Sequence, residues 1–205
     1  MLSATAILYL HDRFTKQWHN HPGPFPVAWR DTEGQVRWHS RIELHHRANF
    51  DLWHNEDEAR NPGVTDACLA DVKRRIDRTN QQRNDLAEEL DRALLDHLAT
   101  TGLPNPDAPL HSESPGLIID RLSILALKIY HTREEAERAD APAGHAERNQ
   151  SRLAILEEQR ADLAGCLDAL WRETLAGERR FKLYRQLKMY NDPTLNPAIY
   201  GKPLK

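Results

Sequence analysis

Polar side chains recur at helical spacing in two stretches of this chain, and their types could bind or act on a polar ligand. One row begins at residue 46 and continues at i+3, i+7, i+11 and i+14, and the other begins at residue 77 and continues at i+3 and i+7. The rows are His46, Asn49, Trp53, Asp57 and Arg60, with Glu56 beside them, and Asp77, Asn80 and Asn84, with Asp85 beside them. Asparagine is a poor helix former, so Asn80 and Asn84 in the middle of one long helix call for interior hydrogen bonds or a ligand.

The residue types suggest a chemical role for each member of such a ligand site. Carboxylates could accept sugar hydroxyls or work as general acids and bases, amides orient a ligand, an indole ring stacks on it, and cations hold an anionic group. The predicted catalytic carboxylates are Asp57, Asp77 and Asp120, the amides are Asn49, Asn80 and Asn84, the ring is Trp53, and the cations are Arg60, Arg121 and Lys128. The alternative interpretations are solvated helix faces or a layer of mutually paired side chains.

Two further segments could bind an anion. Ser114-Pro115-Gly116 is a strong helix start, and Gly116 leaves the free N–H groups of the first turn unshielded. Near the C-terminus, Arg185 and Lys188 belong to a stretch in which basic and aromatic residues interleave, a pattern that can bind phosphate groups. The alternatives are an ordinary helix cap and an amphipathic helix with cations at its C-terminal end.

The sequence assigns no metal and no cofactor. A Glu-x-x-His motif at 43–46 fits di-iron helical bundles, but these need two such motifs, and the Asp-x-x-His at 51–54 is a loose second on the same helix. Cys68 and Cys166 are isolated from each other, which excludes a cysteine-based zinc site. The local signatures of serine hydrolases, phosphate-binding loops and dinucleotide folds do not occur.

Composition restricts the fold class and the partners. The 205 residues include only 13 valines and isoleucines, too few for a large sheet, which predicts an all-α protein. A net charge of -3 and a pI near 6.4 argue against nucleic acid as a partner. There is no apolar run of about 18 residues to span a membrane, and no signal peptide. With two lone cysteines, these features predict a cytoplasmic protein.

Twelve prolines divide the chain into its helices, because proline breaks a helix interior. We predict helices at 2–18, 36–60, 65–99, 114–138 and 142–190, the last with a bend near Gly177, within one domain at 1–190 and before an irregular tail at 191–205. Two of them are longer than 30 residues, which predicts an elongated antiparallel bundle of about five helices. The last carries a heptad-like leucine stripe from Leu153 to Leu170, which predicts a homodimer; the alternative is that an antiparallel helix of the same chain covers the stripe.

The chain resembles a bacterial family known as domain of unknown function 4254. The motifs that carry the resemblance are NFDLWHNEDEAR at 49–60, KRRIDRTNQQRND at 73–85, SPGLIIDRLSILALKIY at 114–130 and FKLYRQLKMYNDP at 181–193. The resemblance implies no established activity. Similar proteins tend to be encoded beside glycosyltransferases of cell-envelope glycan assembly, so it implies that setting.

These observations favour a protein that handles a sugar, a sugar phosphate or a nucleotide sugar in envelope polysaccharide biosynthesis. One alternative is a non-catalytic adaptor that docks a glycosyltransferase, with the polar layer fixing its register. Another is an all-α nucleotide pyrophosphatase with magnesium on Glu56, Asp57, Asp77 and Asp85, although its usual Glu-Glu-x-x-Glu spacing is absent. A ligand-binding protein should show a pocket with converging polar groups, and an adaptor should show a closed, paired layer and an exposed apolar patch.

Overall fold

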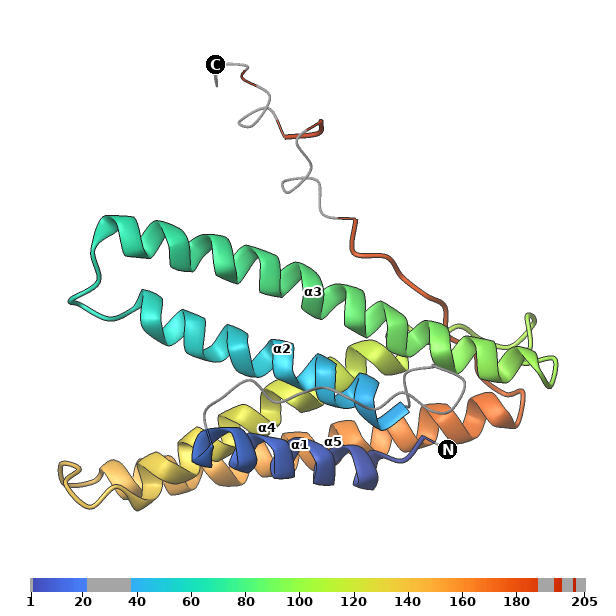
Figure 1. The fold of residues 1–205 in the computed structure, drawn as a ribbon. Coiled ribbons are helices and arrows are strands. Elements are labelled where there is room, and N and C mark those ends of the chain that lie inside the picture. Colours follow the sequence, from blue (N-terminus) through green and yellow to red (C-terminus); the bar gives the residue numbers. More distant parts are fainter. Residues whose placement is uncertain (1, 22–37, 188–193, 197–200, 202–205) are drawn as a thin grey trace.

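The computed structural model describes residues 2–21, 38–187, 194–196 and 201 (Figure 1). These residues form five helices and no strand, and 73% of them are helical. The helices are α1 (Ala4–Asn20), α2 (Trp38–Ala59), α3 (Asp66–Ala99), α4 (Pro115–Glu137) and α5 (His145–Leu175). The all-α prediction is confirmed, and so is the prediction of two helices longer than 30 residues, because α3 has 34 residues and α5 has 31.

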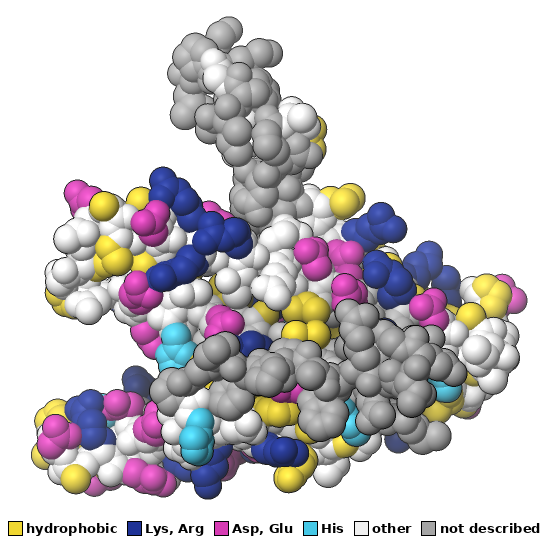
Figure 2. Space-filling view, in the orientation of Figure 1, with side chains coloured by type: hydrophobic (Ala, Val, Ile, Leu, Met, Phe, Trp, Pro, Cys, Tyr) yellow, Lys and Arg dark blue, Asp and Glu magenta, His cyan; other side chains and the backbone are white. Residues whose placement is uncertain are grey.

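The helices form two antiparallel hairpins with α1 packed beside them (Figure 1). One hairpin is α2 with α3 and the other is α4 with α5, while α1 packs on α2, α4 and α5. The central helix is α4, because it contacts each of the other four. The hairpins diverge toward the turns at 60–65 and 138–144, and Figure 2 shows a notch between the two arms.

Local capping explains where three of the helices begin. The hydroxyls of Ser3, Thr65 and Ser114 accept hydrogen bonds from backbone N–H groups of the first turns of α1, α3 and α4. Pro115 then occupies the first position of α4, where its missing N–H is not needed. The predicted starts of α3 and α4 therefore agree with the structure to within one residue.

The predicted end of the fifth helix at residue 190 is wrong. Helix α5 ends at Leu175, and Gly177 has φ = 75°, a backbone conformation that closes a helix and that glycine adopts without strain. The following segment is extended and crosses the chain after α3, with Arg180 N–H donating to the Pro109 carbonyl at 3.1 Å. Phe181, only 2% exposed, anchors this segment in the main core.

The leucine stripe of α5 is covered within the chain. Leu153, Leu167 and Leu170 are buried, and the pair α4–α5 is the most extensive helix contact. The main core joins Leu167 and Leu170 to Ile119 and Leu122 of α4. The reason for predicting a homodimer is thereby removed, and the homodimer itself stays a prediction.

Within the described part of the chain, no helix combines the length and the apolar character needed to cross a membrane. Most of the predicted tail at 191–205 lies outside the described residues, and Thr194–Asn196 includes a turn.

Candidate functional site

A cleft of about 520 Å³ lies between α2, α3 and α4. Six of the predicted site residues line it, namely Asn49, Trp53, Glu56 and Asp57 on α2, Arg60 directly after α2, and Asn80 on α3. Apolar side chains of the three helices complete the wall, among them Leu52, Ile76 and Leu127. Members of both predicted polar rows, on α2 and on α3, therefore line the same cleft, although each row has other members that do not line it.

The site prediction left out Arg83, which lines the same cleft from α3. Its Nη1 lies 3.4 Å from Oδ2 of Asp120, and its Nη2 donates to Oδ1 of Asn84 at 3.1 Å. The α3 side chains at the cleft are Ile76, Asn80 and Arg83, at i, i+4 and i+7. This face is rotated from the row of Asp77, Asn80 and Asn84 on which the prediction relied.

Asp120 is mostly buried next to the cleft and is the centre of a hydrogen-bonded network. Its Oδ1 lies 3.0 Å from Nε2 of His45 and accepts from Nδ2 of Asn49 at 2.9 Å, while Arg83 approaches its second oxygen. Burial by itself raises the pKa of Asp120, but the hydrogen bonds from His45 and Asn49 and the charge of Arg83 hold it below the ordinary value. Asp120 is therefore an ionised carboxylate that positions Arg83 and Asn49 at the cleft.

The network continues away from the cleft through His46. Its Nδ1 lies 2.7 Å from Oγ of Ser123 and its Nε2 lies 2.9 Å from Oγ1 of Thr15, so both ring nitrogens are occupied. Burial, followed by the charge of His45, lowers the pKa of His46 to about 3, so its ring is neutral at pH 7. His46 therefore supports the site from within the core and does not make the predicted contact with a ligand there. Because both of its ring nitrogens are hydrogen-bonded, the Glu-x-x-His motif at 43–46 has no histidine nitrogen left for a metal.

Asn84 does not line the cleft but accepts from Arg83, which does, and four other predicted site residues make their contacts elsewhere. Asp77 is partly exposed and pairs with Lys73, one turn away on α3, and Asp85 accepts from Gln81 at 2.8 Å. Arg121 pairs with Glu113 at 2.8 Å, and together with Lys128 it lines a separate hollow between α4 and α5. Glu56 and Asp57 line the cleft and Asp77 and Asp85 do not, so the four carboxylates considered for magnesium do not form one cluster among the described residues.

The predicted anion site at the start of α4 is filled by the chain itself. The Gly116 N–H donates to Oδ1 of Asp91 at 2.6 Å, and the Ser114 hydroxyl accepts from the Leu117 N–H. A side chain at Gly116 would place its Cβ 2.4 Å from the Ala87 carbonyl oxygen. The glycine therefore allows α4 to approach α3, and the Asp91 carboxylate takes the place that an anion would occupy.

The second predicted anion site is the basic and aromatic stretch that contains Arg185 and Lys188. The alternative interpretation of this stretch, an amphipathic helix, does not hold for its described part. Arg185 is exposed in the extended segment after α5, and the N–H of the next residue, Gln186, donates to Oε1 of Glu88 at 2.8 Å. Lys188 lies outside the described residues.

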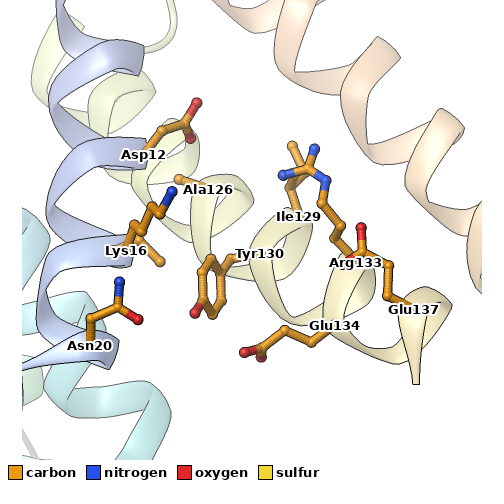
Figure 3. A pocket seen from close by; sticks show the side chains of 10 residues that line it. Asp12, Lys16, Asn20, Ala126, Ile129, Tyr130, Arg133, Glu134 and Glu137 are labelled. Carbon is orange, nitrogen blue, oxygen red and sulfur yellow. The ribbon is translucent and has the colours of Figure 1, made fainter. Parts of the chain in front are cut away.

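A second cavity, of about 410 Å³, lies between α1 and the C-terminal half of α4, and no sequence motif indicates it. Figure 3 shows Lys16 and Asn20 of α1 facing the same space as Tyr130 and Glu134 of α4. Tyr130 stacks on His19 with ring centroids 4.3 Å apart, and Glu134 lies 2.9 Å from Nδ1 of His131. This cavity therefore borders a group of histidines at the same end of the bundle.

The chain belongs to the family described as protein of unknown function (DUF4254), whose model matches residues 39–183. The matched range includes all of α2 except its first residue, and α3, α4 and α5 in full. No curated protein and no solved structure matches the chain.

Proposed function

We propose that this member of the DUF4254 family binds an anionic sugar, such as a sugar phosphate or a nucleotide sugar, in the cleft between α2, α3 and α4. The observation that carries the proposal is the convergence of Trp53, Asp57, Asn80 and Arg83 on one cleft. Envelope glycan assembly, the setting implied by the family resemblance, uses ligands of this class.

Each of these side chains suits one part of such a ligand. The Trp53 ring offers an apolar face for a sugar ring, and Asp57 and Asn80 offer acceptors and donors for hydroxyl groups. Arg83 offers a planar guanidinium for a phosphate or carboxylate, and the ion pair with Asp120 holds that group in place. Asp57 is the one predicted catalytic carboxylate that lines the cleft, so it is the candidate for any acid–base step.

The test compares glucose 1-phosphate, UDP-glucose and uncharged glucose by isothermal titration calorimetry. We expect the two phosphorylated probes to bind and glucose to bind at least 10-fold more weakly, because Arg60 and Arg83 supply charge-assisted hydrogen bonds. Arg60→Ala should weaken binding of the phosphorylated probes about 10-fold, and Trp53→Ala should weaken binding of UDP-glucose.

Arg121→Ala is the matched control, because Arg121 is another exposed arginine that pairs with a glutamate but faces a different hollow. It should leave every affinity unchanged. Absence of binding at millimolar concentration for both phosphorylated probes, or equal losses in Arg60→Ala and Arg121→Ala, would refute the proposal.

One observation favours the adaptor as the second candidate, namely that the polar layer next to the cleft is largely paired with itself. Four hydrogen bonds join its residues into one network: His45 to Asp120, Asp120 to Asn49, Asn49 to Ser123 and Ser123 to His46. Buried polar groups of this kind can specify a unique packing without taking part in binding. The adaptor would be favoured if no phosphorylated probe binds and the network proves to be needed for stability.

A further inference from the structure

Three histidines from three helices meet at the end of the bundle where the hairpins diverge. His19 lies in the last turn of α1, His54 lies on α2 and His131 lies on α4. Each offers one ring nitrogen, and these three atoms all lie within 4.8 Å of one another. The ring centroids are 5.1 Å apart for His19 and His54, 4.9 Å for His19 and His131, and 5.9 Å for His54 and His131.

The Nε2 atoms of all three rings are buried and have no hydrogen-bond partner among the described residues. A buried polar atom without a partner destabilises the folded state, so three at one place need a physical reason. A cation held between the rings would accept all three nitrogen lone pairs at once and supply that reason.

In His19 and His131 the hydrogen bond made by Nδ1 determines that Nε2 carries the lone pair. Nδ1 of His19 lies 2.7 Å from the Thr15 carbonyl oxygen, and Nδ1 of His131 lies 2.9 Å from Oε2 of Glu134. Carbonyl and carboxylate oxygens only accept, so each Nδ1 carries the proton and each neutral ring presents a lone pair at Nε2. Metal-binding histidines are held by outer partners of this kind.

Neighbouring aromatic rings hold the histidines in orientation. Trp53 stacks on His131 with centroids 4.8 Å apart and an interplanar angle of 10°, and Tyr130 stacks on His19. Phe50 meets both His19 and His54 edge-on. Stacking accounts for the positions of the rings, but it does not require three Nε2 lone pairs to converge.

We propose that His19, His54 and His131 bind a divalent transition-metal ion, with Zn²⁺ as the ion that a three-histidine set suits best. Tetrahedral zinc with bonds of about 2.1 Å sets its ligand nitrogens about 3.4 Å apart, so the rings close slightly around the ion. This assignment goes beyond the proposed sugar binding and does not depend on it.

The test measures zinc binding by tag-free protein that has been stripped with a chelator. Competition with a chromogenic zinc chelator should give one Zn²⁺ per chain with a dissociation constant below about 1 μM, and Co²⁺ should give the visible absorption of a tetrahedral centre. His54→Gln and His131→Gln should each weaken zinc binding at least 100-fold. Glu134→Gln should weaken it about 10-fold, since it replaces the outer partner of His131.

His39→Gln is the matched control, because His39 is an exposed histidine on the same helix as His54. It should bind zinc as the wild type does. Circular dichroism checks that each variant folds, and if one ligand variant is unfolded, the other carries the comparison. Zinc at 100 times its dissociation constant should also raise the wild-type melting temperature by about 5–10 °C.

Failure of the wild type to take up zinc at 10 μM would overturn the assignment, and so would equal affinity in the wild type, His54→Gln and His131→Gln. The readout of this experiment is zinc and not sugar, so it is independent of the calorimetry. If no phosphorylated probe binds, the zinc assignment can still hold, and if no zinc binds, the proposed sugar binding can still hold.

Discussion

Substitution of Asp120 by asparagine tests whether the network next to the cleft stabilises the fold. The change keeps the shape of the side chain and removes its charge. The amide oxygen can still accept from His45 and Asn49, which now lie 3.0 and 2.9 Å from Oδ1. The amide nitrogen, however, then faces the guanidinium of Arg83, so two donors meet where an ion pair stood.

The magnitude follows from the burial of this pair. The side chains of Asp120 and Arg83 are 16% and 23% exposed, and breaking a fully buried pair costs about 3–5 kcal/mol. Partial exposure of Arg83 places the expected loss at the lower end, about 3 kcal/mol. For a chain of 205 residues this lowers the melting temperature by about 6–12 °C.

The assay is thermal unfolding at pH 7 followed by circular dichroism, with two aspartates as comparisons. Asp77→Asn should melt within about 2 °C of the wild type, because Asp77 pairs only with Lys73 on an exposed helix face. Asp57→Asn should melt at the same temperature or slightly higher, because Asp57 lies beside Glu56 in the open cleft. If Asp120→Asn also melts within 2 °C of the wild type, the network does not stabilise the fold and the reasoning is wrong.

Three further outcomes are expected. Gly116→Ala should lower the free energy of unfolding by about 1–3 kcal/mol in urea titrations, because its Cβ would meet the Ala87 carbonyl oxygen at 2.4 Å; unchanged stability would show that α3 and α4 can separate there without cost. Burial raises the pKa of Asp91 to about 6, so the folded state binds this proton more tightly than the unfolded state. Stability from this group should therefore fall as pH rises from about 4 to about 6, by about 3 kcal/mol, and urea titrations across that range should give a flatter profile for Asp91→Asn; equal slopes would contradict it. Phe181→Ala should cost about 3–5 kcal/mol of unfolding free energy by the same method, because the ring is buried in the main core, whereas Tyr184→Ala in the same extended segment should cost less than 1 kcal/mol.

The helices could be predicted from the sequence because their signals are local. Proline positions, the Ser114-Pro115 start and helical periodicity place four of the five helices close to their observed bounds. The fifth extends in the prediction to residue 190 because its periodicity continues past Gly177. The left-handed turn at that glycine and the burial of Phe181 against the core decide where the helix ends.

The sequence also identified the residue types of the cleft, but it could not fix which helix face each residue occupies. In a long helix, a row at i, i+3 and i+7 lies beside a row at i, i+4 and i+7, so the sequence alone does not distinguish them. The packing of α2 and α4 against α3 determines that the row with Asn80 and Arg83 faces the cleft. For the same reason the Asp77 side chain is 41% exposed while Asn84, one turn beyond Asn80, is buried.

Contacts between distant segments were beyond the sequence altogether. Asp91 fills the N-terminus of α4, and His19, His54 and His131 converge from three helices, although no short spacing connects them. The sequence did show that seven of the eleven histidines lie before residue 55, a concentration that gives no indication of which rings meet. Local sequence determines where a helix forms, because backbone hydrogen bonds and caps are local. The meeting of side chains depends on how helices cross, and the burial of the whole core decides that.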